Sequence, residues 1–276
     1  NDLKHAGKTA KTDYARKYIY GIDFDDKPVK IARAMMLIAG DGRSHILKLN
    51  SLNTKEWHGD ESEKERARPE LRERLHKFED YDKDKNNKEN FKYFDFDILL
   101  SNPPFAGEIH ETPLLKEYEL AKNDKGKLRH KMERHILFIE RSLELVRPGG
   151  RLAIVLPQGV FNNSNMAYVR DYLLDKARIL AVVGLDVNIF KPHTGTKTSV
   201  IFLQKWNEKE KPPKDYPIFM AVSKKSGKDN SGEYVYRKDK DGNLMFDAQG
   251  KKILEHDLDQ IVEEFRKFRA RGNINY

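Results

Sequence analysis

Segments typical of buried β-strands alternate with segments of helical period along most of this 276-residue chain. The apolar runs Ile98–Leu100 and Leu152–Leu156 have strand length, whereas Val29, Ala32 and Met36 recur at the spacing of one helix face. This alternation is typical of a largely parallel sheet with helices on both faces. We therefore expect an α/β fold with strands at Tyr18–Asp23, His45–Asn50, Asp97–Ser101, Arg151–Leu156, Ile179–Leu185 and Ser199–Gln204.

Two helices have clear ends in the sequence. Pro28 favours a helix start, because its missing N–H falls in the first turn, and Gly40 ends the helical period that follows. A second apolar face runs over Leu137–Val146 and ends at Arg147–Gly150, whose Pro-Gly-Gly turns into the next strand. The stretch Asp60–Asn90, by contrast, is charged and poor in apolar residues. We expect a solvated helix and a mobile loop there, not a compact unit.

The composition changes again after Trp206, where a Lys-, Glu- and Pro-rich connector begins. We therefore expect one domain over residues 1–206 and a C-terminal extension over residues 207–276. Asp241-Gly242 lies between Tyr234–Tyr236 and Asn243–Phe246, which predicts a small hairpin. Leu254–Phe268 has the period of an amphipathic helix.

Composition excludes several classes of protein. The chain has no Cys, which excludes disulfides, cysteine nucleophiles and thiolate metal sites. Its longest apolar runs are far shorter than the roughly 20 residues that span a bilayer, and Asn1–Tyr20 has no apolar core of a secretory signal, so we expect a cytoplasmic protein. The net charge of +8 permits an anionic partner such as nucleic acid, although a solvated basic surface gives the same number.

The most specific local feature is Ser101-Asn102-Pro103-Pro104-Phe105, at the end of an expected strand. Ligands of open α/β sheets bind beyond the carboxyl ends of the strands. Two prolines stiffen the backbone and leave carbonyl acceptors beside the Asn102 side chain, so this corner can accept both N–H bonds of a planar amine while Phe105 stacks on its ring. An ordinary strand-ending turn is the structural alternative.

Two earlier strands end in residues suited to a nucleoside. Asp23 can accept hydrogen bonds from ribose hydroxyls, and Phe24 can contact an adenine ring. An N-cap is the alternative role for Asp23, but Asp25 or Asp26 suits that role better before Pro28. Asn50-Ser51 can offer an amide to a purine edge, or can form a simple turn.

Other chemistries lack support in the sequence. Gly195-Thr196-Lys197-Thr198 does not have the spacing of a triphosphate-binding loop. His130 and His135 lie on different helix faces and His193 stands alone, so we expect solvated or capping roles for them and no metal site.

Five motifs in chain order resemble the motif series of S-adenosylmethionine-dependent N6-adenine DNA methyltransferases, and most closely that of the modification subunits of type I restriction-modification systems. The resemblance covers Tyr18–Lys205 and includes the order and spacing of the motifs. The C-terminal helix is also similar to the family's helical tail. The motifs are Gly21-Ile22-Asp23, Leu49-Asn50-Ser51-Leu52, Ser101–Phe105, Arg147–Pro157 and Thr194–Thr198.

The resemblance implies a Rossmann-like methyltransferase sheet, S-adenosylmethionine as cofactor and methyl transfer to N6 of a flipped adenine in DNA, without a metal. It also implies a prokaryotic cytoplasmic protein that works with DNA and a separate specificity subunit, and it leaves open whether a nuclease subunit joins them. The implied residues are Asn102, Pro103, Pro104 and Phe105 for catalysis, Asp23, Phe24, Asn50 and Ser51 for the cofactor, and Phe190, Thr196 and Lys197 for the target base or DNA.

The chain departs from the family at its start. The family's first strand ends in a glycine-rich motif that wraps the methionine part of the cofactor, but Asn1–Lys17 holds the single glycine Gly7. We therefore expect a fragment that lacks the first strand of the sheet. Asp186 stands where the family often has Pro.

Two alternatives to adenine methylation stay open. A protein glutamine or an RNA guanine offers a similar planar amino group to an Asn-Pro-Pro corner. Without the glycine-rich motif, the chain could also be a non-catalytic, DNA-associating fragment. Binding of S-adenosylmethionine distinguishes the methyltransferase hypotheses from the hypothesis of a non-catalytic fragment.

Overall fold

The structure is a computed structural model that describes residues 7–40, 45–207, 213 and 215–272. The chain divides into two compact units, Asn1–Asp95 and Phe96–Tyr276. The expected boundary between residues 206 and 207 stays a prediction. The strand that follows it, β9 (Phe219–Val222), pairs with a strand of the second unit.

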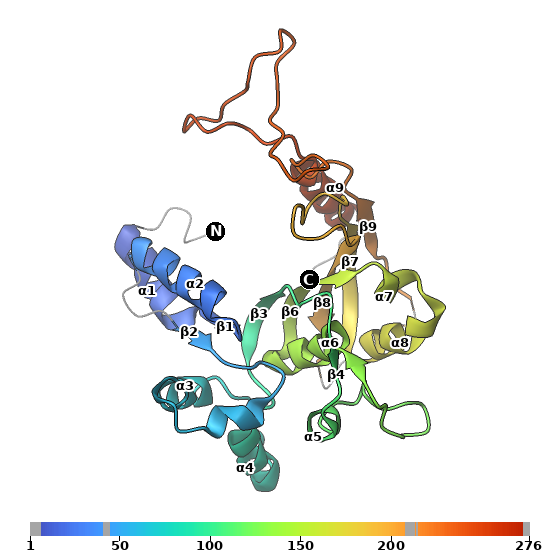
Figure 1. Ribbon diagram of the computed structural model, residues 1–276. Coiled ribbons are helices and arrows are strands. Elements are labelled where there is room, and N and C mark those ends of the chain that lie inside the picture. The colour runs from blue at the N-terminus through green and yellow to red at the C-terminus, as the bar shows by residue number, and fades with distance from the viewer. Residues whose placement is uncertain (1–6, 41–44, 208–212, 214, 273–276) are drawn as a thin grey trace. The chain divides into compact units, whose positions relative to one another are not determined.

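The first unit is built on two parallel strands, β1 and β2 (Figure 1). Tyr20 lies opposite His45 and Asp23 opposite Lys48, so both strands end at the same edge. The Asp25 side chain accepts a hydrogen bond from the Lys27 N–H at 3.0 Å, which makes it the N-cap of α2. The elements are α1 (Lys8–Tyr18), β1 (Tyr20–Asp23), α2 (Asp26–Ile38), β2 (His45–Lys48), the 3₁₀ helix η2 (Thr54–His58), α3 (Ser62–Arg72) and α4 (Tyr81–Asn90).

The polar stretch Asp60–Asn90 forms two helices, so the prediction of one helix and a loop was wrong. Ala67 and Leu71 of α3 are buried, and Asn87 of α4 is buried as well. The apolar anchors lie just outside the stretch: the Trp57 ring packs 5.6 Å from Phe91 and 6.3 Å from Phe94 between centroids. Composition inside the stretch therefore underestimated its capacity to pack.

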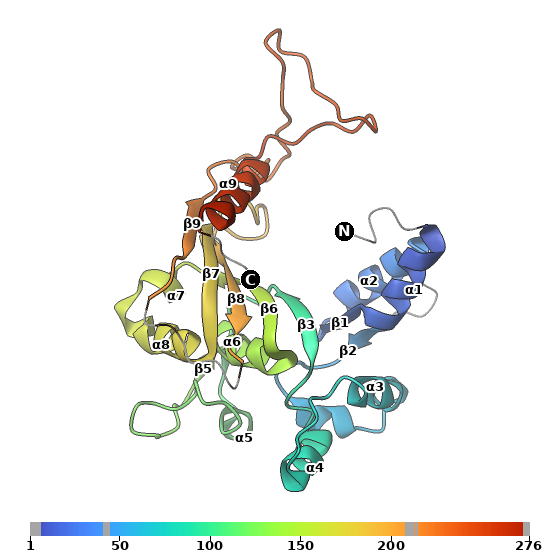
Figure 2. The same cartoon turned by 180° about the vertical axis from the view of Figure 1, so that it is seen from behind.

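The second unit holds a five-stranded sheet in the order β3-β6-β8-β7-β9 (Figures 1 and 2). A short strand pair, β4 with β5, lies outside this sheet. The elements are β3 (Phe96–Ser101), β4 (Glu108–Ile109), α5 (Thr112–Leu115), β5 (Met132–Glu133), α6 (Arg134–Leu145), β6 (Val146–Pro157), α7 (Gly159–Asn162), the 3₁₀ helix η3 (Ser164–Met166), α8 (Ala167–Lys176), β7 (Ala177–Gly184), β8 (Thr198–Lys205), β9 (Phe219–Val222) and α9 (Leu258–Arg271).

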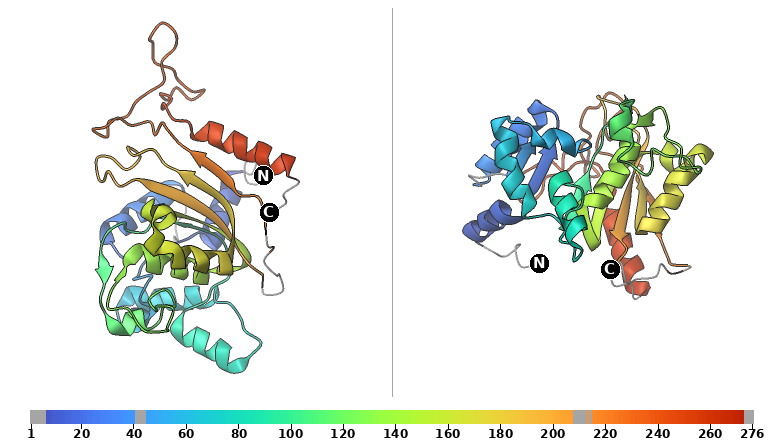
Figure 3. Two further views of the ribbon diagram at one scale, coloured as in Figure 1. Left: turned by 90° about the vertical axis from the view of Figure 1, so that its right-hand side faces the viewer. Right: turned by 90° about the horizontal axis from the view of Figure 1, so that it is seen from below.

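The five-stranded sheet is mixed, which corrects the expectation of a largely parallel one. β8 runs antiparallel to both of its neighbours, β6 and β7, while the pairs β3–β6 and β7–β9 are parallel. Helices cover both faces, with α6 and α8 on one side and α9 on the other (Figure 3). Phe219 of β9 packs against Phe265 and Phe268 of α9, with ring centroids 5.3 and 5.5 Å apart.

The C-terminal helix α9 begins at Leu258, later than the expected Leu254. Leu254 and His256 pair with Tyr236 and Ser226 in isolated bridges and so remain extended. The expected pairing of Tyr234–Tyr236 with Asn243–Phe246 was wrong, because Tyr234 bridges Lys228 and Tyr236 bridges Leu254. Asp241-Gly242 does form a turn, which is closed by a bridge between Lys238 and Leu244. Among the described residues, no helix has both the length and the apolarity needed to cross a membrane.

Candidate active site

Ser101–Phe105 leaves the sheet at the carboxyl end of β3. Ser101 is the last residue of β3 and pairs with Ile154 of β6. The two prolines that follow have no N–H, so pairing stops there. Asn102 is exposed and Pro103 is buried. A polar amide is therefore presented at the strand end on a backbone that two prolines fix.

Phe105 forms an aromatic pair with Phe190. Their ring centroids are 5.3 Å apart and the rings meet edge to face at 72°. Phe190 belongs to the segment between β7 and β8, so the chain brings together two residues that are 85 positions apart. This contact joins a predicted catalytic residue to a predicted base-contacting one.

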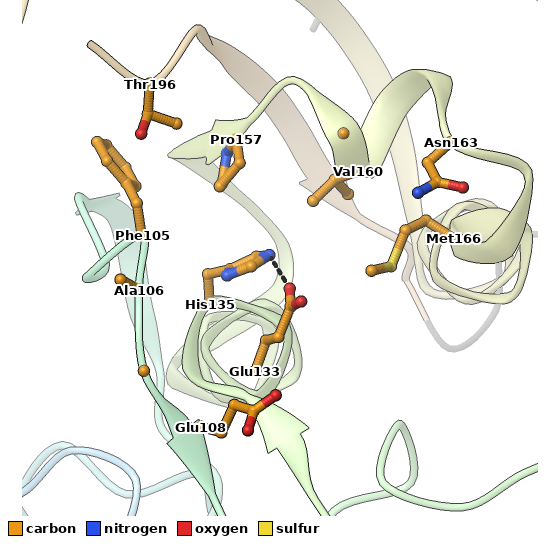
Figure 4. A pocket seen from close by; sticks show the side chains of 12 residues that line it. Phe105, Ala106, Glu108, Glu133, His135, Pro157, Val160, Asn163, Met166 and Thr196 are labelled. Carbon is orange, nitrogen blue, oxygen red and sulfur yellow. Dashed lines mark ion pairs between the residues drawn. The ribbon is translucent and has the colours of Figure 1, made fainter. Parts of the chain in front are cut away.

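A pocket of about 440 Å³ lies directly beside Phe105 (Figure 4). Its volume is within the range of roughly 300–1,000 Å³ that is usual for ligand sites. The carboxyl ends of β3 and β6, the start of α6 and the α7 region supply its walls. The lining residues are Phe105, Ala106, Gly107, Glu108, Glu133, His135, Pro157, Gly159, Val160, Asn163, Met166 and Thr196.

The walls of this pocket differ in chemistry. Phe105, Pro157 and Val160 give an apolar surface on which a flat ring can lie. Glu108 and Glu133 lie opposite each other in the β4–β5 pair and place two carboxylates on another wall. A hydrogen bond from Lys131 lowers the pKa of Glu108. An acidic wall disfavours a phosphate and accepts hydrogen-bond donors of a neutral ligand.

His135 and Glu133 also line the pocket, and neither is among the site residues predicted from the sequence. His135 is 4% exposed, and its Nε2 lies 3.1 Å from a Glu133 carboxylate oxygen (Figure 4). Burial lowers the pKa of His135, and the charge of Glu133 opposes that shift. Of the two expected roles, solvated or capping, burial excludes the solvated one for this histidine. Its place at the start of an apolar helix was the available signal.

The Thr194–Lys197 loop is fixed against the pocket by short-range hydrogen bonds. The Thr194 hydroxyl donates to the Thr196 hydroxyl at 2.9 Å and accepts from the Thr196 N–H at 3.1 Å. The Gln158 N–H donates to the Lys197 carbonyl at 2.9 Å, just after β6. Thr196 therefore lines the pocket, while the exposed Lys197 contributes its backbone to the loop.

The predicted cofactor residues lie in the first unit, at the common carboxyl edge of β1 and β2. Asp23 is exposed, and one of its carboxylate oxygens accepts a hydrogen bond from the Asp25 N–H at 2.8 Å. Phe24 beside it is 69% exposed. An exposed carboxylate next to an exposed ring at the ends of parallel strands fits the ribose and adenine of a nucleoside.

Asn50 forms the turn that was its alternative role. Its side-chain oxygen accepts from the Leu52 N–H at 3.2 Å, and its amide nitrogen lies 3.3 and 3.4 Å from the Glu56 carboxylate oxygens. The Trp57 indole N–H donates to the Asn50 carbonyl at 2.8 Å. Ser51 is partly buried beside it. A contact between this turn and a purine stays a prediction.

The predicted residues therefore form two groups. Phe105, Phe190 and Thr196 meet at the pocket of the second unit, where Asn102–Pro104 leads into Phe105. Asp23, Phe24, Asn50 and Ser51 share one strand edge of the first unit. Within the described parts of the chain, no three His, Asp or Glu side chains are placed to hold a metal ion.

Comparisons with known proteins agree with this architecture. The methylase subunit of the Escherichia coli type I restriction enzyme EcoEI is 29% identical over 110 residues, which are 40% of this chain and 21% of that protein. The StySPI methylase subunit of Salmonella potsdam is 30% identical over 110 residues, 40% of this chain and 19% of that protein. The matched part thus spans about one fifth of the length of these relatives.

Solved structures show the same fold at low sequence identity. The type I restriction-modification methyltransferase subunit of Streptococcus thermophilus matches with a TM-score of 0.50 and 20% identity, over 91% of this chain and 42% of its own. The Type ISP restriction-modification enzyme LlaGI, solved with a DNA substrate mimic, matches with a TM-score of 0.54 and 12% identity, over 91% of this chain and 27% of its own.

A family model confirms the resemblance over almost the whole chain. The match runs over residues 3–271 and therefore includes both units and the C-terminal helix. The family is described as N-6 DNA methylase, in agreement with the motif order from Asp23 to Thr198. This chain belongs to the N-6 DNA methylase family.

Proposed function

We propose that this chain transfers the methyl group of S-adenosylmethionine to N6 of an adenine in DNA, as a modification subunit of a restriction-modification system. The observation that carries the proposal is the Asn102–Phe105 corner at the end of β3, beside a pocket that its own Phe105 lines. The names of the relatives and the family support the same reaction.

In the proposed mechanism, the corner binds the exocyclic amine of a flipped adenine. The Asn102 side-chain oxygen and the Pro103 carbonyl accept its two N–H bonds, and Phe105 lies on the face of the ring. These acceptors draw on the amine protons and leave the N6 lone pair free to accept a methyl group. The N–CH3 bond would form as the sulfonium S–CH3 bond breaks, leaving a neutral thioether, and one N6 proton would pass to solvent. Because the prolines fix the acceptors in advance, most of the rate gain comes from alignment.

S-adenosylmethionine supplies an electrophilic methyl group on a sulfonium. Asp23 suits its ribose hydroxyls, and the exposed Phe24 suits its adenine. Asn50 and Ser51, in the turn after β2, are proposed to lie beside the same adenine. No described residue is assigned to the methionine part. The acidic wall formed by Glu108 and Glu133 supports a neutral base, not a phosphate, as the occupant of the pocket.

The proposed partners are DNA and a specificity subunit that reads the recognition sequence. The type I relatives are named as methylase subunits, which supports a partner subunit for this chain. Helix α9, at the end of the extension after residue 206, is the proposed site of assembly. Association with a nuclease subunit is not part of the proposal.

The decisive test is Asn102→Ala. We expect methyl transfer from tritiated S-adenosylmethionine to adenine-containing DNA to fall by at least about 100-fold, because an acceptor that aligns the amine is lost. Affinity for S-adenosylmethionine, measured by calorimetry, should stay unchanged. Asn162→Ala is the matched control, since this exposed asparagine lies in α7 and does not line the pocket.

Three outcomes contradict the proposal. Full methyl transfer by the Asn102→Ala variant would refute the role of Asn102 in binding the amine. Methylation of protein or RNA but not of DNA favours the other planar amines. Failure of the native, fully assembled enzyme to bind S-adenosylmethionine favours a non-catalytic DNA-associating protein.

A further inference from the structure

The segment Lys224–Glu255, here named the arm, projects from the second unit between β9 and α9 (Figures 1 and 3). Every residue from Lys238 to Lys252 is exposed. The distal half of the arm therefore does not pack into the core of the unit. Long segments that do not contribute to the core of a domain usually have a function of their own.

The arm is braced from within by three turns of one sequence pattern, Asp-x-x-Gly. In each turn an Asp oxygen accepts backbone N–H bonds, for example from Asp241 and Asn243 to Asp239, both at 2.9 Å. The Gly of each turn has a positive φ of 75° to 95°, which suits glycine. The turns are Asp229–Gly232, Asp239–Gly242 and Asp247–Gly250.

Bridges and cation–π contacts join the turns into one shaped element. Tyr236 pairs with Leu254, and the Met245 N–H donates to the Arg237 carbonyl at 3.0 Å. The Lys252 ammonium lies 5.3 Å from the centre of the Tyr236 ring. The arm therefore presents its side chains from a defined backbone instead of a loose loop.

The root of the arm is fastened to the segment that carries Phe190 and Thr196. The Ser226 hydroxyl donates to Asp186 at 2.9 Å, and the Lys228 ammonium donates to the Lys191 carbonyl at 2.7 Å. At Gly232, an added Cβ would lie 2.6 Å from the Pro192 nitrogen. The arm thus rests directly on the loop that borders the proposed base pocket.

The segment Leu244–Phe246, between the two distal turns of the arm, combines exposed apolar residues with nearby cations. Leu244, Met245 and Phe246 are 38%, 41% and 54% exposed. The arm holds eight lysine and arginine residues against six acidic ones. Its turn carboxylates are engaged by backbone donors. The ammonium groups of Lys238, Lys240 and Lys251, by contrast, form no ion pair with the described residues.

We propose that the arm is a DNA-contacting element, in which Lys238, Lys240 and Lys251 bind backbone phosphates and the Leu244–Phe246 segment lies against the duplex that carries the flipped base. The proposal rests on DNA as the substrate of the neighbouring pocket. Apolar wedges flanked by basic residues are typical of proteins that distort a duplex. Taking a base out of the stack requires such distortion, and the arm starts from the loop beside the pocket that would receive it.

The first test measures the salt dependence of DNA binding. A labelled duplex is titrated with the complete enzyme, including any subunits that it carries, between 50 and 200 mM salt. Each lost phosphate contact removes about 0.9 from the slope of log K against log salt, so Lys238→Ala/Lys240→Ala/Lys251→Ala should make the slope less negative by up to about 2.7. These side chains are exposed, so the melting temperature should not change.

A matched control exists in another turn of the same kind. Asn123–Gly126 repeats the pattern with Asn in place of Asp, and Lys122, Lys125 and Lys127 are exposed around it. This loop lies at the end of the second unit that is remote from the arm (Figure 1). The Lys122→Ala/Lys125→Ala/Lys127→Ala variant should keep the native slope. An unchanged slope in the arm variant, or an equal change in both variants, overturns the proposal.

The second test separates the contribution of the Leu244–Phe246 segment from that of the lysines. Phe246→Ala should lower affinity for the duplex at every salt concentration without changing the slope, because an apolar contact releases no counterions. Native DNA affinity together with loss of a co-purifying subunit would identify the arm as a protein-binding surface and overturn the proposal. Both tests measure DNA binding, so they stay distinct from the methylation test. If the native enzyme methylates DNA and the arm variants bind DNA as the native enzyme does, the proposal for the arm is refuted and the proposed function is not.

Discussion

At the residue scale, the motif Asn102–Phe105 could be found from sequence because its chemistry depends on adjacent residues. Two prolines and one amide side chain at the end of an expected strand can be recognised from the amino-acid sequence alone. Glu133 and His135 could not be assigned in this way, because their role depends on burial. The place of His135 at the start of an apolar helix indicates burial, but only the packing of α6 against β6 makes it a pocket residue.

The burial of His135 predicts a pH dependence of stability. Burial lowers its pKa from the ordinary value of 6.5, so the unfolded chain binds a proton at higher pH than the folded chain does. The stabilisation is present above about pH 6.5 and is lost as the pH falls toward the folded-state pKa, with a slope of at most about 1.4 kcal/mol per pH unit. We expect His135→Gln to flatten this part of the profile in urea unfolding.

The exposed His130→Gln variant is the control for that measurement and should retain the native profile. If His135→Gln shows the same loss of stability between pH 7 and 5 as the native protein, the buried imidazole is not the responsible group. Other carboxylates and histidines would then carry the acid sensitivity.

At the element scale, all six expected strands are present, with ends shifted by a few residues. The direction of β8 was missed, although the sequence held the signal. Ile179–Leu185 and Ser199–Gln204 are joined by a segment without a helical period, whereas a parallel pair needs a longer crossover, usually helical. Helices α3 and α4 were misjudged for the opposite reason, because their apolar partners Trp57 and Phe91 lie outside them.

The arm's turns give a prediction at this scale. Hydrogen bonds from Asn243 and neighbouring N–H groups lower the pKa of Asp239, so its charged form stabilises the turn. We expect Asp239→Ala to speed amide exchange at Asn243 and Gly242. Acidification should weaken the native turn in the same way. The stabilisation is present above the ordinary pKa of 3.8 and is lost as the pH falls through the lowered pKa of the folded state.

Asp241→Ala is the matched control in this turn, because Asp241 contributes its backbone N–H, and not its carboxylate, to the hydrogen bonds of the turn. Its amide exchange should match that of the native protein. Equal exchange in both variants would mean that backbone pairing, such as the Lys238–Leu244 bridge, holds the turn without the Asp239 carboxylate.

At the scale of the whole molecule, the fold class followed from the alternation of strand and helix periods, but the division after Asp95 did not. The sequence showed a composition change at Asp60, and the first unit extends well past it. Its core is formed by side chains that are far apart in the chain, from Leu47 of β2 to Phe94. Contacts of that kind define a unit and leave no local signature.

The core of the first unit yields the last prediction. Trp57 is 1% exposed, packs against Phe91 and Phe94, and donates its indole N–H to the Asn50 carbonyl. Trp57→Ala should therefore cost about 3–5 kcal/mol through the cavity that it leaves. Native-state amide exchange should show lost protection in β2 and α3, while β6 and β8 of the second unit stay protected. Because Asn50 loses its anchor, its proposed role in cofactor binding predicts a lower affinity for S-adenosylmethionine as well. Equal loss of protection in β6 and β8 would show that the two units unfold as one.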